Sequence, residues 1–251
     1  VTIFMGYAQE KITPYGNRQA KGEQVEQMFD HIAHSYDDLN HWLSWGIDRR
    51  WRRATVDAMK SLPHDELLDV ATGTGDFAML ACRRLQPKSI LATDFSEGMM
   101  AVARKKVKEA GMDHIISFQK EDCLQLSLPD ESFDAVTVAY GVRNFQDLDK
   151  GLREICRVLR PHGAAVILEL CTPRSFPMKQ LFWLYSHIVM PLLGRLVSKD
   201  PRAYTYLPAT MEAFPQGEVM QQILLRAGFK RVEFRRFTFG LSTVYIAHKQ
   251  V

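Results

Sequence analysis

The sequence contains no hydrophobic run that is typical of a transmembrane helix. Its longest apolar stretch, residues 178–197, is interrupted by Lys179, His187, Pro191 and Arg195, and charged side chains are costly inside a bilayer. The first residues, VTIFMGYAQEKITPYG, lack the continuous apolar segment of a signal peptide. We therefore expect a cytoplasmic protein, and leave open a peripheral contact at the inner face of the membrane.

Cysteine is scarce, and a strong excess of one charge is also missing. The four cysteines, Cys82, Cys123, Cys156 and Cys171, lie far apart and form no C-x-x-C pair. This spacing favours reduced thiols and predicts neither a disulfide framework nor a bound metal. A net charge of +3 over 251 residues is too weak for a nucleic-acid groove. We interpret the local basic cluster RRWRR (49–53) as an exposed helix face.

The composition that remains is ordinary for one globular domain. Hydrophobic residues make up 46% and charged residues 24% of the chain, which is the balance of a soluble domain with one sizeable core. No internal repeat or low-complexity tract divides the sequence. We expect a single domain over residues 1–251.

Between about residue 66 and residue 170, short apolar runs alternate with segments of helical periodicity. The predicted strands are LLDVA (67–71), ILATD (90–94), IISFQKED (115–122), FDAVTVAY (133–140) and AAVILEL (164–170). Helices are predicted between them, with Ser96 as an N-cap, Gly111 as a stop and Pro161 as a later terminator. This alternation predicts a parallel sheet covered by helices on both faces.

Three segments lie outside this alternation. Residues 21–60 have a helical pattern and are expected to form an N-terminal cap, and residues 172–212 are expected to form a helical insertion or lid. The last runs, KRVEFRRF (230–237) and LSTVYIAHK (241–249), predict two strands joined as an antiparallel hairpin. The expected fold class is therefore α/β, with a Rossmann-like, mostly parallel sheet that ends in an antiparallel hairpin.

The loop after the first predicted strand reads GTGDFA (73–78) and matches the pattern G-x-G-x-x-G/A. Gly73 and Gly75 let the backbone approach a ligand closely, and Asp94 follows about 20 positions later, where an acid accepts hydrogen bonds from ribose hydroxyls. This spacing fits either a dinucleotide or S-adenosylmethionine. A simple tight turn is the structural alternative to both.

Charge distinguishes the two ligands. A helix N-terminus holds a pyrophosphate through backbone N–H groups, and Asp76, which has no partner nearby in the sequence, would oppose it together with Asp69. The sulfonium and ammonium of S-adenosylmethionine would instead be attracted. Asp122, beside Cys123 at the end of the third strand, can accept from an adenine amino group. We favour S-adenosylmethionine and keep a dinucleotide-dependent oxidoreductase as an alternative.

Longer segments of the chain carry a more specific signal. They are KGEQVEQMFDHIAHSYDDLNHWLSWGIDRRWRR (21–53), LLDVATGTGD (67–76), LATDFSEGMM (91–100), LPDESFDAVTVAYGVRN (128–144), REICRVLRPHGAAVILEL (153–170) and LFWLYSHIVMPLLG (181–194). Together these segments resemble the UbiE/MenG family, the C-methyltransferases of menaquinone and ubiquinone biosynthesis. The resemblance extends over nearly the whole chain, and MFDHIAHSYDDLN and YGVRN are its most specific parts.

The resemblance implies a seven-stranded class I methyltransferase sheet that binds S-adenosylmethionine at the C-terminal ends of its strands. It implies cofactor contacts at Thr74, Asp94, Asp122 and Cys123, whereas Ala139 replaces a serine that many members use. It also implies C-methylation of a polyprenylated quinol. We expect demethylmenaquinol as the substrate, with the ubiquinone-pathway benzoquinol as the alternative, and leave a homodimer open.

The chemistry of ring methylation suggests further residues. A ring carbon becomes nucleophilic when the neighbouring hydroxyl ionises, and a free phenol has a pKa of about 10. Arg143, after the fourth strand, is a candidate to stabilise the phenolate, with a structural ion pair as the alternative. Asp76 is the first candidate base, followed by His31, Asp37 and Glu169.

Other residues are expected to cover the two ends of the ligands. Tyr36 is expected to close over the methionine end of the cofactor. Apolar residues at near-helical spacing in the insertion predict a lid or a channel for the prenyl tail, with ordinary packing as the alternative; they are Leu181, Phe182, Leu184, Tyr185, Ile188, Val189, Leu192 and Leu193.

Two other classes of protein remain as rivals. Nucleic-acid amino-methyltransferases usually carry an Asn/Asp-Pro-Pro-Tyr element after the fourth strand, and this chain has AYGVRN (139–144) there. We therefore expect no nucleic-acid partner. A regulatory protein that binds the cofactor without turnover is the second rival.

Overall fold

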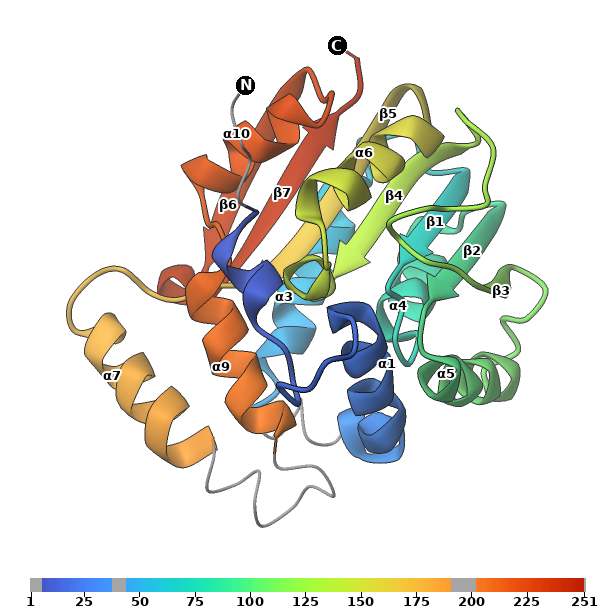
Figure 1. The fold of residues 1–251 in the computed structure, drawn as a ribbon. Helices are drawn as coiled ribbons and strands as arrows, with labels where there is room; N and C mark the ends of the chain where they lie inside the picture. Colours follow the sequence, from blue (N-terminus) through green and yellow to red (C-terminus); the bar gives the residue numbers. More distant parts are fainter. Residues whose placement is uncertain (1–5, 38–43, 191–201, 251) are drawn as a thin grey trace.

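A computed structural model describes residues 6–37, 44–190 and 202–250 of the chain. Its centre is a seven-stranded sheet with the strand order β3-β2-β1-β4-β5-β7-β6 (Figure 1). The strands are β1 (Glu66–Val70), β2 (Ser89–Asp94), β3 (Ile116–Lys120), β4 (Phe133–Ala139), β5 (Leu159–Leu170), β6 (Arg231–Phe237) and β7 (Ser242–His248). Strand β7 runs antiparallel to both β5 and β6, and the other pairs are parallel. The predicted fold class and C-terminal hairpin are confirmed.

Helices cover both faces of this sheet. They are α1 (Lys21–Ile32), α3 (Ile47–Met59), α4 (Asp76–Leu85), α5 (Glu97–Glu109), α6 (Leu148–Val158), α7 (Met178–Leu184), α9 (Ala203–Ala213) and α10 (Glu218–Arg226). Short helical turns are η1 (Ala8–Lys11), η2 (Ala33–Ser35), η3 (Val142–Asn144), η4 (Tyr185–Val189) and η5 (Thr238–Gly240). One hydrophobic core joins the sheet to α6 and α10, and a second joins it to α3, α4 and α5.

Most predicted boundaries agree with the structure, with one clear difference in β5. The Ser96 hydroxyl caps α5 by accepting a hydrogen bond from the backbone N–H of Met99 at 3.1 Å, as predicted. Strand β5 begins at Leu159, five residues before the predicted start at 164. Its first residue pairs with Phe133, and the register then shifts before Ala164 pairs with Ala135. This irregularity accommodates Pro161 inside the strand.

The strand order reverses between β1 and β4, which are neighbours in the sheet. In sheets of this kind the crevice at the carboxyl ends of the strands at such a reversal binds ligands. Gly75 ends the loop after β1 with φ +80°, and a Cβ there would lie 3.1 Å from the Cβ of Ala103. The start of α4 therefore packs closely against α5, and Asp76 is the first residue of α4.

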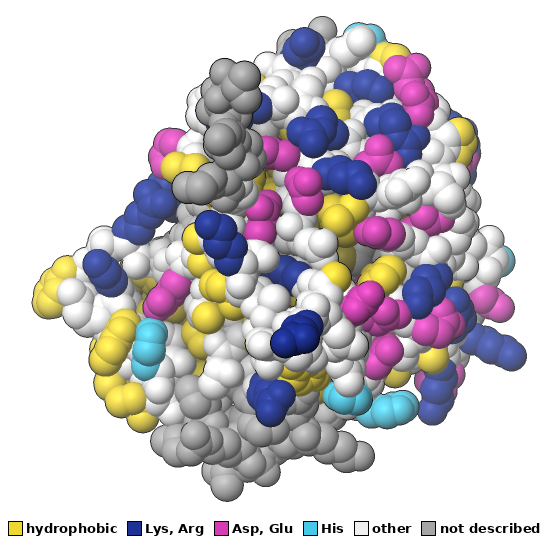
Figure 2. All heavy atoms as spheres, viewed as in Figure 1, with side chains coloured by type: hydrophobic (Ala, Val, Ile, Leu, Met, Phe, Trp, Pro, Cys, Tyr) yellow, Lys and Arg dark blue, Asp and Glu magenta, His cyan; other side chains and the backbone are white. Residues whose placement is uncertain are grey.

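The insertion between β5 and β6 carries an apolar outer surface. Figure 2 shows hydrophobic side chains gathered along α7, and Leu181, Trp183 and Leu184 are each about half exposed. No helix in the described part of the chain is long and apolar enough to cross a membrane.

Candidate active site

Two cavities meet at the carboxyl edge of the sheet. The first, which we call the acidic cavity, has a volume of about 360 Å³ and is lined by the loop after β1, the ends of β2 and β4, and α1. The second, which we call the apolar cavity, has a volume of about 430 Å³ and is lined mainly by α1, α3, α7 and α9. The residues that line both cavities are Phe29, Tyr36, Arg52 and Tyr140.

Most of the cofactor residues predicted from the sequence lie in one place. The predicted residues that line the acidic cavity are Tyr36, Asp69, Gly73, Thr74, Asp94, Asp122 and Cys123. Gly75 does not line it, because this glycine is the N-cap of α4 and faces Ala103. The structure therefore shows a packing role for Gly75, and its contact with the cofactor stays a prediction.

Asp94 connects the glycine loop to the next helix. Its Oδ2 accepts a hydrogen bond from the backbone N–H of Gly73 at 2.7 Å, and its Oδ1 accepts one from the N–H of Ser96 at 2.9 Å. Burial raises the pKa of Asp94, while these backbone donors oppose the rise. Each carboxylate oxygen has a second lone pair, so the side chain can still accept from ligand hydroxyls.

Asp69 lies beneath the same loop, at the end of β1. Its carboxylate accepts hydrogen bonds from the hydroxyls of Thr72, at 2.6 Å, and Thr137. Burial raises the pKa of Asp69 to about 6, and the two hydroxyl donors oppose the rise. Its contacts hold β1, β4 and the loop together in the floor of the acidic cavity.

Asp76 has partners that the sequence does not reveal. Its carboxylate contacts the Lys106 ammonium and lies 3.5 Å from Nη1 of Arg52. Lys106 also contacts Asp37 at 2.7 Å, and Asp37 accepts a hydrogen bond from the Thr74 hydroxyl at 2.5 Å. The interpretation of Asp76 as an acid without a partner is therefore wrong, because α5 and α3 bring cations to it.

The cavity as a whole nevertheless has the charge that the sequence argument required. Seven carboxylates and one cation, Arg52, line it among the described residues; the acids are Glu23, Glu26, Asp69, Asp76, Asp94, Glu121 and Asp122. Such a wall repels a pyrophosphate and attracts a sulfonium and an ammonium. The residues present thus fit S-adenosylmethionine.

Asp122 and Cys123, which follow β3, also line the acidic cavity. Asp122 is exposed, and its Oδ1 accepts a hydrogen bond from the backbone N–H of Leu124 at 2.8 Å. Burial raises the pKa of the Cys123 thiol, so this sulfur stays protonated. A neutral thiol and an exposed acid can contact the edge of a flat, polar ring, as the predicted contact of Asp122 with adenine requires.

The apolar cavity contains a buried ion pair. Arg143 follows β4, and its Nη1 lies 2.7 Å from Oε1 of Glu169 at the end of β5. Glu169 is fully buried and does not line the cavity, whereas Arg143 does. Beside Arg143, the buried hydroxyl of Tyr206 has no hydrogen-bond partner among the described residues. Arg143 and Tyr206 thus place two polar side chains on one side of a mostly apolar cavity.

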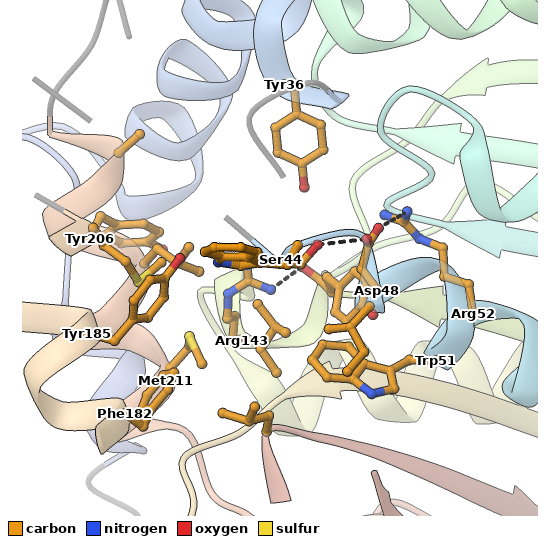
Figure 3. A pocket seen from close by; sticks show the side chains of 18 of the residues that line it. Tyr36, Ser44, Asp48, Trp51, Arg52, Arg143, Phe182, Tyr185, Tyr206 and Met211 are labelled. Atoms are coloured by element: carbon orange, nitrogen blue, oxygen red, sulfur yellow. Dashed lines mark hydrogen bonds and ion pairs between the residues drawn. The ribbon is translucent and has the colours of Figure 1, made fainter. Parts of the chain in front are cut away.

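Across the cavity lies a second buried pair, which the sequence analysis did not identify. Nη1 of Arg52 contacts Oδ2 of Asp48 at 2.7 Å, and Oδ1 of Asp48 accepts a hydrogen bond from the Ser44 hydroxyl at 2.7 Å. Figure 3 shows this group opposite Arg143 and Tyr206. The exposed face predicted for RRWRR is correct for Arg49, Arg50 and Arg53 but wrong for Trp51 and Arg52.

A signal for this pair is present in the sequence. Asp48 and Arg52 are spaced i, i+4, and the buried positions of α3 continue at Thr55, Val56 and Met59. This helical period places the pair on the inner face of α3. It could have been found by reading the cluster as part of an amphipathic helix.

The other candidate bases lie away from the apolar cavity. His31 is exposed, 3.4 Å from the Tyr15 hydroxyl, and Asp37 is bound to Thr74 and Lys106. Asp76 lines the acidic cavity but not the apolar one.

The insertion divides its apolar residues between the cavity and the surface. Leu181, Phe182 and Tyr185 line the apolar cavity. Leu184, Ile188 and Val189 are exposed. Leu192 and Leu193 lie outside the described residues.

A family model and two known proteins match most of this chain in sequence. A model of the ubiE/COQ5 methyltransferase family matches residues 17–249. A demethylmenaquinone methyltransferase of Bacteroides fragilis is 60% identical over 245 residues, which cover 98% of this chain and 100% of that protein. The ubiquinone/menaquinone biosynthesis C-methyltransferase UbiE of Geobacter sulfurreducens is 42% identical over 98% of this chain and 96% of its own.

One solved structure is similar to this chain in fold, although its sequence identity is low. The (4+2) cyclase SpnF aligns with a TM-score of 0.67 at 18% identity, covering 92% of this chain and 96% of its own.

Proposed function

Because the chain belongs to the ubiE/COQ5 methyltransferase family, we propose that it methylates a ring carbon of demethylmenaquinol. The chain is an S-adenosylmethionine-dependent methyltransferase. The substrate is inferred from the name of the relative that is 60% identical over nearly the whole length. The benzoquinol of ubiquinone biosynthesis is the second candidate, since the name of another relative includes that pathway.

The observation that carries this proposal is the junction of the two cavities. The acidic cavity suits the charge of the cofactor, and the apolar cavity, at about 430 Å³, lies in the size range of small-molecule sites. Because Phe29, Tyr36, Arg52 and Tyr140 line both, a ring in one cavity can reach a methyl group in the other. Holding two reactants in line in this way supplies much of the acceleration of a bimolecular step.

The polar side chains of the apolar cavity suit the quinol ring. S-adenosylmethionine supplies an electrophilic methyl group on its sulfonium. Arg143, held by Glu169, is proposed to donate hydrogen bonds to one ring oxygen, and the Tyr206 hydroxyl donates to the same oxygen. For Asp76, whose carboxylate faces only the acidic cavity, we propose contact with the ammonium end of the cofactor rather than catalysis. Thr74, Asp94, Asp122, Cys123 and Tyr36 are proposed as further cofactor contacts.

The insertion is proposed to receive the prenyl tail at a membrane surface. Helix α7 and the helical turn η4 present apolar side chains both to the cavity and to solvent. Phe182 and Tyr185 face the cavity, and Trp183, Leu184 and Ile188 are exposed to solvent. A helix with apolar groups on both sides has no ordinary solvent face. Contact with a lipid surface would bury the outer side chains and let a lipid-soluble tail enter the cavity.

A product analysis tests the proposed function. Demethylmenaquinol and the demethylated benzoquinol, both kept reduced, are incubated in parallel with the protein and S-adenosylmethionine, and the products are analysed by mass spectrometry. We expect one added methyl group on the ring of the naphthoquinol. Transfer to the benzoquinol alone would change the substrate, and transfer to neither would overturn the proposal.

A further inference from the structure

Methylation of a quinol requires a place for the hydroxyl proton, and the structure narrows the choice of acceptor. Among the described residues that line the apolar cavity, Asp48 is the only carboxylate, and there is no histidine or lysine. Four described tyrosines line the cavity, namely Tyr36, Tyr140, Tyr185 and Tyr206. A phenol, with an ordinary pKa of about 10, is protonated at neutral pH and cannot accept a second proton, and burial raises the pKa of Tyr140, Tyr185 and Tyr206 further. Glu169 is fully buried, is paired with Arg143 and does not line the cavity. The geometry therefore leaves Asp48 as the group that a bound hydroxyl can reach.

Arg52 connects Asp48 to the boundary between the two cavities, where the methyl group is proposed to be transferred. Its guanidinium contacts Asp48 on the side of the apolar cavity and Asp76 on the side of the acidic cavity, at 2.7 and 3.5 Å. It is the only charged side chain, among the described residues, that lines both cavities. Both contacts use Nη1, and the guanidinium lies 5.3 Å from the centre of the Tyr140 ring. Arg143, in contrast, lines the apolar cavity alone.

We propose that Asp48 is the general base of the reaction and that Arg52 binds the phenolate that results. This inference rests on the proposed quinol substrate. Asp48 takes the proton of the hydroxyl next to the methylated carbon, and the O–H electron pair stays on the ring. The ring carbon attacks the methyl carbon, and the bond from that methyl to sulfur breaks, leaving its electron pair on sulfur. The methylated carbon then loses its hydrogen as a proton to solvent, and the C–H electron pair restores the aromatic ring. The protonated Asp48 returns its proton to the ring oxygen, so the carboxylate is regenerated and one proton is released overall.

The ion pair between Asp48 and Arg52 favours this step. Before proton transfer the guanidinium neutralises Asp48, and afterwards it neutralises the phenolate, so the buried charge only moves from one neighbour of Arg52 to another. Asp48 and Arg52 are both buried, so keeping the net charge of the cavity constant avoids the large cost of creating an unpaired buried charge. Ser44 orients the carboxylate through its hydrogen bond. Arg143 and Tyr206, on the opposite side, are left for the second ring oxygen.

The test combines Asp48→Asn with substrates of different acidity. With demethylmenaquinol we expect kcat to fall by about 10²- to 10⁴-fold, the usual contribution of a general base, while the Kd for S-adenosylmethionine, measured by calorimetry, stays unchanged. With 1,4-naphthalenediols made more acidic by fluorine on the second ring, the defect should shrink steadily. Asp57→Asn, which removes an exposed acid of the same helix paired with Arg84, is the matched control and should retain wild-type kinetics.

A double variant distinguishes loss of the base from loss of folding. Asp48→Asn leaves Arg52 with less compensation, so Asp48→Asn/Arg52→Gln removes both charges and should show at least the same defect. A wild-type rate in either variant, or a defect that is equally large for acidic and ordinary substrates, would overturn the proposal. If the wild-type protein methylates no quinol, the proposed function is wrong. If the wild-type protein methylates a quinol and the Asp48 variants do so at the same rate, the proposed function stands and only the role of Asp48 is wrong.

Discussion

Two arginines face the same cavity, and their partners distinguish them. Arg143 is held by Glu169, which is fully buried and cannot meet a ligand. Arg52 is held by Asp48, which lines the cavity and can. A buried arginine–carboxylate pair is weak evidence for stability by itself, because desolvation offsets much of the Coulomb attraction. What matters for function is therefore which member of each pair the substrate can touch.

Replacing both members of the pair formed by Arg143 and Glu169 separates catalysis from folding. Arg143→Ala alone would leave Glu169 buried without its cation, which typically costs about 3–5 kcal/mol. We therefore expect Arg143→Met/Glu169→Gln to fold with a smaller loss of stability. If Arg143 stabilises a ring oxygen, this variant should bind S-adenosylmethionine normally but lose about 10²- to 10³-fold in kcat. Thermal unfolding, calorimetry and steady-state kinetics measure the three quantities, and an unchanged kcat would reduce Arg143 to a structural role.

At the scale of elements, α7 and η4 have an unusual surface, because many of their exposed side chains are apolar. No residue of α7 is buried, yet its sequence, MKQLFWL, is mostly apolar. The inner side chains line the cavity and the outer ones, including Trp183 at 55% exposure, face solvent. Exposed apolar patches occur at interaction sites, and a tryptophan is favoured where lipid and water meet, so this surface supports the proposed membrane contact.

Trp183→Ser/Leu184→Ser should weaken the proposed membrane contact without damaging the proposed active site. Neither residue lines the apolar cavity, so kcat for a quinol analogue without a tail should be unchanged. Binding to lipid vesicles, measured by co-sedimentation, should fall by about tenfold or more, because two half-exposed apolar side chains lose their burial in lipid. Val219→Ser, which removes an equally exposed apolar side chain on α10, is the control. Equal vesicle binding by all three proteins would argue against the membrane contact.

At the scale of the whole molecule, local patterns predicted the sheet but not the side-chain pairs that cross it. The periods of the apolar runs gave the strands and the hairpin, because alternation and length are local properties of the chain. Asp76 looked unpaired because its partner Lys106 lies 30 residues away on another helix. The sequence suggests a surface position for Arg52 because four of the five residues in RRWRR are basic. Such pairings depend on how helices pack, and only the assembled fold reveals them.

Asp69 links the centre of the sheet to the acidic cavity, so its ionisation should affect the stability of the whole fold. Burial raises its pKa from 3.8 to about 6 in the folded protein. Between about pH 4 and pH 6 the unfolded chain has lost this proton while the folded protein still holds it. The folded state thus binds more protons in this window, and the contribution of Asp69 to the free energy of unfolding falls as the pH rises.

Comparison with Asp69→Asn isolates this contribution, because asparagine does not titrate. Urea unfolding of the cofactor-free proteins at several pH values should show wild type losing stability relative to Asp69→Asn as the pH rises from about 4 to about 6, with a constant difference above that range. Asp57→Asn should give a flat difference over the same window, since a hydrogen bond from Arg84 lowers the pKa of Asp57. A difference for Asp69→Asn that stays flat, or that changes in favour of wild type with rising pH, would mean that this carboxyl is already ionised beneath the glycine loop in mildly acidic solution.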